Sequence, residues 1–297
     1  MDRAKISLII SMLIFGSIGL FVRNIPFSSS QIALERGIVG TIFLFLASFL
    51  FTHRISWTRI RPNLWLLLAS GIAIGINWIF LFQSYHYTTI SNATICYYFA
   101  PIFVMFLSPL ILKERLKKIT VLCILSAMAG MFCIVGMDNG ETGTNNTLGI
   151  VYGLAAAALY ASIIIINKFL KNISGIESTF IQLLVSAISL FPYVFLTDGF
   201  QMSTASNLSI VLLIIVGVVH TGIGYFIYFS AIQKLNSQTI ATFSYIDPIS
   251  AILMSSLFLH EEMTLLQIFG GILILGATFV NEMFGTKKEF NQLKENV

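Results

Sequence analysis

Long apolar runs constrain this chain more than any other feature of its sequence. Stretches such as 6–22 and 208–229 are almost uninterrupted runs of apolar residues, and each approaches the ~20 residues that a helix needs to cross a bilayer. Unpaired backbone amide groups cannot face lipid, so only helices and closed barrels span membranes. Barrel strands instead show alternating segments of about 10 residues. The runs therefore predict an all-α, polytopic membrane protein.

The composition supports the same class. Of the 297 residues, 57% are hydrophobic and 10% are charged, and the mean hydropathy is +0.88. A soluble domain averages roughly a quarter charged residues. Soluble enzymes, nucleic-acid-binding proteins and disordered chains are therefore disfavoured. The first apolar run is also too long for a cleaved signal peptide.

We expect ten membrane-spanning helices joined by short connections. Their approximate ranges are 6–22, 31–51, 64–84, 91–112, 119–137, 148–168, 178–197, 208–231, 238–259 and 265–284. Residues 287–297 are expected to form a short, charged cytoplasmic tail.

The positions of the basic residues predict the orientation. With a cytoplasmic N-terminus, the cytoplasmic ends of the spans carry 15 Lys and Arg residues, and the outer ends carry only Arg23. An excess of basic residues marks cytoplasmic loops. We therefore expect a multi-pass protein of the plasma (inner) membrane with both termini in the cytoplasm. The net charge of +4 then reflects topology and indicates no nucleic-acid partner.

The second half of the chain resembles the first at an offset of 147 residues. The aligned positions include Tyr98 with Tyr245, Pro101 with Pro248, and Glu114 with Glu261. Residues 1–140 and 141–286 then form two repeats of five helices each. Because five is odd, the second repeat enters the membrane from the opposite side. Inverted repeats of this kind recur in secondary transporters.

Several motifs are similar to those of one known family. They are Tyr98-Phe-Ala-Pro101 with Leu112-Lys-Glu114-Arg, Tyr245-Ile-Asp-Pro248 with Leu259-His-Glu261-Glu, and His220-Thr-Gly-Ile-Gly-Tyr225. Over nearly its whole length the chain resembles the ten-span members of the EamA family, in the drug/metabolite transporter superfamily. Phe15 stands where many members carry Trp. The resemblance implies a two-times-five-helix bundle, a central cavity and movement of small metabolites, often outward.

These observations predict a secondary-active transporter. It would move small metabolites, such as amino acids or amines, by alternating access, as an exporter coupled to protons. Its partners would be the substrate, protons and the lipid bilayer. A channel and a non-transporting membrane scaffold remain as alternatives. We expect no enzyme, cofactor or metal site, because the sequence has no Gly-x-Ser-x-Gly, P-loop or paired metal-ligand motif.

Two prolines and two ionisable residues lie near the middle of predicted spans. Pro101 and Pro248 each remove a helical hydrogen bond, and a break at the same depth in both repeats indicates a midplane site. Asp247 costs at least ~2.5–3.5 kcal/mol in lipid. Because desolvation favours the neutral carboxyl group, Asp247 could exchange protons near neutral pH. His220 titrates in the physiological range, and the two residues could form a proton switch.

Each of these residues also has a structural interpretation. The prolines could be packing kinks, Asp247 could join two helices by a hydrogen bond, and His220 could be a neutral group bonded to a neighbouring backbone. The sequence does not show whether Asp247 and His220 touch.

Further candidates line the expected substrate pathway. Their aromatic rings suit amine or aromatic solutes, and a buried amide needs partners; they are Asn77, Trp78, Tyr98, Tyr160, Tyr225, Tyr228 and Tyr245. The rings could equally be packing residues. Glu35 and Arg36 are placed at an outer vestibule, with Arg36 alternatively reaching the headgroups.

The charge distribution generates a topology prediction. Single cysteines at positions 143 and 290, in a background without Cys96, Cys123 and Cys133, should differ in reactivity toward an impermeant reagent. In intact cells, we expect labelling at position 143 and none at position 290. The opposite pattern would show that the chain is inserted in the reverse orientation.

Overall fold

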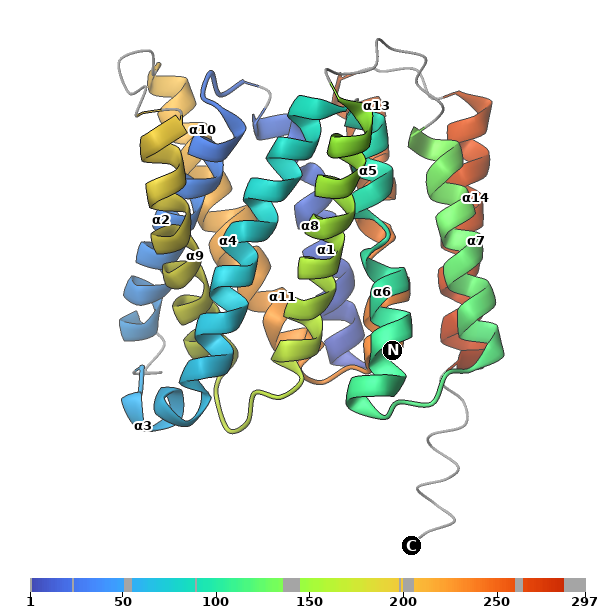
Figure 1. Ribbon diagram of the computed structural model, residues 1–297, viewed down its shortest axis with the longest axis horizontal. Coiled ribbons are helices and arrows are strands. Elements are labelled where there is room, and N and C mark those ends of the chain that lie inside the picture. The colour runs from blue at the N-terminus through green and yellow to red at the C-terminus, as the bar shows by residue number, and fades with distance from the viewer. Residues whose placement is uncertain are drawn as a thin grey trace, which may run out of the picture.

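All regular secondary structure in the described part of the chain is helical (Figure 1). This computed structural model describes residues 2–22, 24–50, 55–88, 90–135, 145–197, 199, 206–259 and 264–285. The predicted all-α membrane class is confirmed. Arg23, the outer-loop residues 139–144, Glu261 and the predicted tail 287–297 lie outside the described residues.

Helices occupy each of the ranges expected from the apolar runs. They are α1 (Arg3–Val22), α2 (Ser29–Leu50), α3 (Trp57–Ile60), η1 (Arg61–Asn63), α4 (Leu64–Tyr87), α5 (Ile90–Tyr97), α6 (Ala100–Leu107), η2 (Ser108–Leu112), α7 (Lys118–Val135), α8 (Asn146–Asn167), α9 (Gly175–Thr197), α10 (Asn207–Ile215), η4 (Val216–Ile223), α11 (Gly224–Ile232), α12 (Ser237–Phe243), α13 (Ile246–Leu259), α14 (Leu265–Val280) and η5 (Asn281–Gly285).

The described helices suit a bilayer. Seven helical segments are long and apolar enough to cross a membrane, and Lys118–Cys133 and Ile268–Val280 are shorter apolar helices. Large apolar side chains cover the outside of the bundle, as at Leu196 and Phe49, which are 80% and 65% exposed. Such a surface matches lipid rather than water. The chain is therefore a polytopic membrane protein, while the number of ten spans stays a prediction.

Four of the expected spans are not continuous α-helices; the last of them, 265–284, ends in the π-helix η5. α5 ends at Tyr97 and α6 begins at Ala100, while α12 ends at Phe243 and α13 begins at Ile246. Pro101 and Pro248 thus fall in the first turn of a new helix, where a missing N–H costs little. The interruptions lie where the prolines predict them. The π-helix η4, between α10 and α11, has no counterpart in the sequence prediction.

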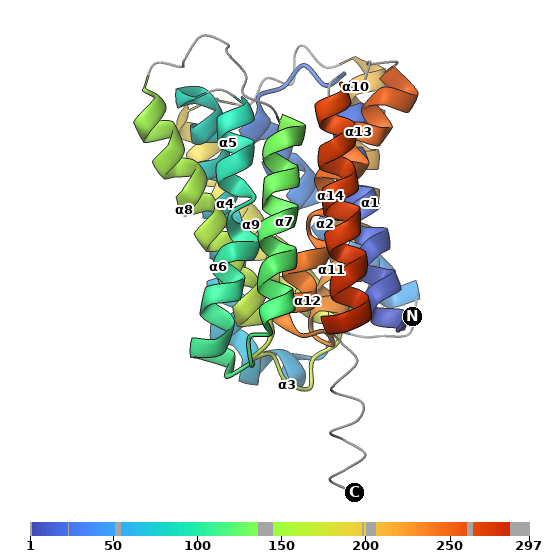
Figure 2. The ribbon, with the colours of Figure 1, turned by 90° about the vertical axis from the view of Figure 1, so that its right-hand side faces the viewer.

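The helices pack in pairs that correspond between the two halves. α1 packs against α13, and α8 packs against α5 and α6; α4 packs against α9, and α2 packs against η4. The last long helices of the halves, α7 and α14, lie side by side at one edge of the bundle (Figures 1 and 2). The N-terminal end of α1 and the end of η5 lie at the same end of the bundle (Figure 2).

A glycine allows α1 to approach α13 closely. A Cβ atom on Gly16 would lie 2.7 Å from the Asp247 carbonyl oxygen and 2.8 Å from the Ala251 nitrogen. Real Cβ atoms do not come this close to backbone atoms. α1 therefore needs glycine here to sit directly against the start of α13.

We predict that Gly16→Ala lowers the free energy of unfolding by about 1–3 kcal/mol, because the added methyl group overpacks the α1–α13 contact. Thermal unfolding of the purified protein in detergent measures the change. Gly19→Ala is the matched control on the same helix, because a Cβ atom there has no neighbour within 4 Å. Equal stability of the two variants would contradict the close contact.

Candidate functional site

The two helix interruptions are joined by their equivalent tyrosines. The Tyr98 hydroxyl donates to Asp247 Oδ2 at 3.0 Å, and the Tyr245 hydroxyl donates to the Tyr98 carbonyl oxygen at 3.2 Å. Their rings are stacked, with centroids 6.3 Å apart. Each interruption therefore receives a side chain from the other half, and Asp247 lies at the junction.

Aromatic side chains extend from this junction through the middle of the bundle. We call them the aromatic cluster: Phe15, Trp78, Tyr97, Tyr98, Tyr160, Tyr225, Tyr228 and Tyr245. Tyr97 stacks on Tyr160 at 5.6 Å between centroids, and the hydroxyls of Tyr160 and Tyr228 are 2.9 Å apart. Phe15 contacts the rings of Tyr225 and Tyr228 at 5.1 and 5.8 Å. The cluster thus connects α1, α5, α8 and α11.

Arg36 joins this cluster from α2. Its Cζ atom lies 4.3 Å from the centroid of the Trp78 ring, and the Trp78 and Tyr225 centroids are 6.1 Å apart. Such a distance gives a cation–π contact. Tyr225 lies within electrostatic range of both Arg36 and Asp247. The cluster therefore carries one group able to be positive and one able to be negative.

Part of this region remains accessible. Asp247, Tyr160 and Tyr225 lie deep inside the bundle, yet each keeps some exposed surface, whereas Tyr228 is 1% and Tyr245 0% exposed. Partial exposure of groups so far inside shows that space at least as large as a water molecule adjoins them.

Three predicted site residues form their hydrogen bonds with groups outside the aromatic cluster. Asn77 Nδ2 donates to the Ala156 carbonyl oxygen at 2.6 Å and so joins α4 to α8. Glu35 accepts from Gln31 Nε2 at 2.8 Å, one turn earlier on α2. His220 lies in η4, with Nε2 3.0 Å from Ser17 Oγ of α1. Within the described residues, His220 and Asp247 make no hydrogen bond or ion pair with each other.

The structure also brings in residues that the sequence prediction omitted. Tyr97 and Phe15 belong to the aromatic cluster, and Ser17 is the partner of His220. Tyr97 precedes a predicted pathway residue, and Ser17 is a polar residue in an apolar run. Both residues could therefore have been noticed in the sequence. Their positions along the chain, however, do not show which side of each helix faces the centre of the bundle.

A surface pocket lies apart from the aromatic cluster. It has a volume of about 600 Å³ and is lined by Thr58, Arg59, Pro62, Asn63, Leu66, Phe169, Lys171 and Asn172. Asn63 closes one side, because its Nδ2 donates to the Lys171 carbonyl oxygen at 2.9 Å and its Oδ1 accepts from the Lys171 N–H at 3.0 Å. These contacts attach the α3–η1 segment to the α8–α9 connection.

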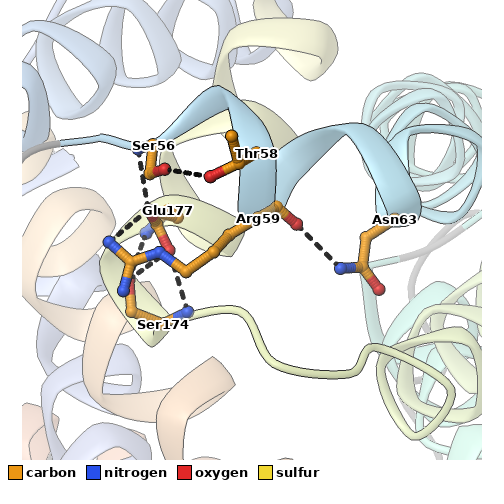
Figure 3. A network of polar contacts seen from close by, with 6 residues as sticks. All are labelled: Ser56, Thr58, Arg59, Asn63, Ser174 and Glu177. Atoms are coloured by element: carbon orange, nitrogen blue, oxygen red, sulfur yellow. Dashed lines mark hydrogen bonds and ion pairs between the residues drawn. The ribbon is translucent and has the colours of Figure 1, made fainter.

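A buried carboxylate strengthens the same attachment (Figure 3). Glu177, 1% exposed, accepts from Ser56 N at 2.9 Å and from Ser174 N at 3.0 Å, and it pairs with Arg59 at 3.1 Å. Glu177 N donates in turn to Ser174 Oγ at 3.3 Å. Ser174 and Glu177 thus form a capping box at the start of α9.

A second carboxylate joins the two halves at the start of α12. Both oxygens of Glu114 accept from Ser237 N at 3.1 Å, and Gln238 Nε2 donates to the Arg115 carbonyl oxygen at 2.8 Å. A carboxylate at a helix N-terminus is favourable. The segment after η2 therefore holds the beginning of α12.

Metal binding has no support in the described part of the chain. No group of three or more His, Cys, Asp or Glu residues there could hold an ion. Cys96, Cys123 and Cys133 are free cysteines.

The fold and this site define a helical membrane protein whose interrupted helices meet at a polar, aromatic centre. The model of the EamA-like transporter family matches residues 3–136 and 147–283. The chain belongs to this family, as its motifs indicated.

Relatives and a solved structure agree with this membership. The chain is 29% identical to the uncharacterized transporter YxxF of Bacillus subtilis (strain 168), over 91% of this chain and 88% of that protein. It is 25% identical to an uncharacterized transporter of Archaeoglobus fulgidus, over 94% and 96% of the two chains. A crystal structure at 14% identity superposes with a TM-score of 0.81, over 94% of this chain and 98% of the other, and shows the same fold.

We predict that Glu177→Ala lowers the free energy of unfolding by about 1–3 kcal/mol, because the Ser56 and Ser174 N–H groups lose their acceptor. Arg59→Gln is the control. Arg59 is 45% exposed, and exposed ion pairs contribute at most about 1 kcal/mol. Chemical denaturation in detergent measures both variants. A larger loss for Arg59→Gln than for Glu177→Ala would show that the ion pair, and not the capping, holds this end together.

Proposed function

We propose that this protein is a secondary-active transporter that exports small metabolites across the plasma membrane by alternating access, coupled to protons. One observation carries the proposal. The interruptions of two spans are linked to each other through Tyr98, Tyr245 and Asp247 inside an accessible aromatic centre. Broken helices at a midplane site are a recurring feature of secondary transporters.

The proposed architecture consists of ten spans in two inverted repeats, 1–140 and 141–286, with both termini in the cytoplasm. The corresponding packing of α1 with α13 and of α8 with α5 and α6 supports it, as does the separate match of each half to the family model. Two similar halves can exchange conformations and thereby open a shared centre to each side in turn. The Glu114–Ser237 contact joins the halves at one end.

Asp247 is the proposed proton-exchanging group. Its carboxylate accepts from Tyr98 and makes no ion pair with any described residue. Desolvation without a cationic partner favours the protonated form. The first turn of α13 partly offsets this preference, because a helix N-terminus stabilises negative charge. Because desolvation and the helix N-terminus act in opposite directions, a change in the hydration of Asp247 would be enough to release its proton.

His220 is the proposed modulator, and α1 provides its link to Asp247. Ser17 of α1 bonds to His220, while the neighbouring Gly16 packs against the Asp247 carbonyl oxygen. A shift of α1 would therefore affect both groups, although they do not touch.

The remaining predicted residues are assigned to the substrate site, to helix packing or to the outer vestibule. The proposed substrate site consists of Trp78, Tyr98, Tyr160, Tyr225, Tyr228 and Tyr245. In this conformation Tyr98, Tyr160 and Tyr225 keep exposed surface, and the other three are buried behind them. Asn77 positions α4 against α8. Glu35, which bonds to Gln31, remains the proposed vestibule residue.

We predict that Asp247→Asn abolishes proton-driven accumulation in proteoliposomes and leaves substrate binding or exchange partly intact. The Asn side chain is nearly the same size and its Oδ1 can still accept from Tyr98, so the fold should persist. It cannot release a proton. Flux of radiolabelled solutes under an imposed pH gradient, compared with exchange without a gradient, measures the two activities.

His220→Gln is the comparison variant, and it should shift the pH optimum with a smaller loss of rate. Unchanged rate and pH dependence in Asp247→Asn would assign the carboxylate a structural role. Non-saturable flux through the wild-type protein would favour a channel, and no flux of any solute would favour a scaffold.

A further inference from the structure

Arg36 has no anionic partner in the part of the chain that the structure describes. Its guanidinium lies on the Trp78 ring, and its Nε atom is buried without a hydrogen-bond acceptor. The adjacent Glu35 carboxylate instead accepts from Gln31. Asp247 accepts from Tyr98 and forms no ion pair with Arg36.

This arrangement is costly for a protein in a membrane. An arginine is unfavourable by ~2.5–3.5 kcal/mol at the centre of a helix span, and arginines within spans normally pair with an anion or a backbone carbonyl. Arg36 lies in the first half of α2. A cation–π contact recovers only about 0.5–2 kcal/mol. It also gives the buried Nε–H group no acceptor. This unsatisfied donor therefore indicates an acceptor supplied from outside the chain.

The surroundings define the chemistry of that acceptor. Arg36 places a single positive charge on the Trp78 ring of the aromatic cluster. A phosphate, with a charge near −2, would be matched poorly by a single arginine. A carboxylate matches the planar fork of a guanidinium in charge and in shape.

We propose that Arg36 binds the carboxylate of the transported solute, while the ring of Tyr225, which keeps some exposed surface, contacts its apolar, planar part. Trp78 is 4% exposed and packs behind the Arg36 guanidinium. The solute therefore lies with its carboxylate directed toward α2. This inference rests on the proposed transport function and names the substrate class as carboxylates with an aromatic or apolar body.

Trp78 itself can report binding. The chain has three tryptophans, and Trp57 and Trp65 are 60% and 83% exposed. Replacing these two with Phe leaves Trp78 as the only tryptophan, directly under the Arg36 guanidinium. Its emission is then titrated with 3-phenylpropionate, phenylalanine and phenethylamine, which share a ring and differ in charged groups.

We expect saturable emission changes with 3-phenylpropionate and phenylalanine, and binding of phenethylamine at least about tenfold weaker, because it offers no acceptor for the guanidinium. Arg36→Gln should weaken carboxylate binding about tenfold or more. Arg36→Lys should fall between, because the charge stays and the bidentate geometry is lost. Arg59→Gln, a cation in the surface pocket, is the control and should bind like the parent.

Equal affinity for phenethylamine, no response to either carboxylate, or unchanged affinity in Arg36→Lys and Arg36→Gln would overturn the inference. Flux measurements separate this failure from that of the proposed function. Saturable flux of amines without carboxylate binding would leave the transporter standing and exclude the Arg36 role. Arg36-dependent carboxylate binding without flux of any solute would support the Arg36 role and exclude the proposed transport function.

Discussion

The reciprocal contact between the two helix interruptions organises the rest of this structure. Inside a bilayer no water is present to satisfy the backbone groups that a broken helix leaves open. Here the Tyr245 hydroxyl donates to the Tyr98 carbonyl oxygen at the first interruption, and the Tyr98 hydroxyl donates to the Asp247 carboxylate just after the second. These two bonds connect the interruptions to each other. Their junction defines the centre of the bundle, and the aromatic cluster packs around it.

The charged groups of the protein divide into two kinds with opposite physical roles. Glu177 and Glu114 accept hydrogen bonds from backbone N–H groups at helix starts, which explains how a carboxylate, buried in the case of Glu177, can stabilise the ends of the bundle. Arg36 and Asp247 have few partners and lie beside accessible space. A charge left incompletely satisfied in a low-dielectric interior interacts strongly with whatever enters next to it. The second kind is therefore suited to binding solutes and protons.

Much of this arrangement could be predicted from particular residues. The apolar runs predicted helices in the observed ranges, Pro101 and Pro248 predicted the interruptions, and mid-span aromatic residues predicted a central cluster. The partners of Asn77, Glu35 and His220 could not be predicted, because a side chain in a span can turn toward any of several neighbouring helices. The π-helix η4 was not predicted either, because the glycines within it, Gly217 and Gly222, do not by themselves specify a π-helix.

The sequence by itself determined that the protein lies in a membrane, that it is a helical polytopic protein, and where two of its helices are interrupted. These depend on local properties: the hydropathy of consecutive residues, the missing N–H of proline and the cost of a charge in hydrocarbon. Only the tertiary structure decided that Tyr98 meets Asp247, that Arg36 lies on Trp78, and that α1 touches both Asp247 and the Ser17–His220 pair. These contacts join residues far apart in the chain, and they depend on helix rotation and close approach. Lipid-facing and protein-facing sides of an apolar helix look nearly alike in sequence, so packing alone selects between them.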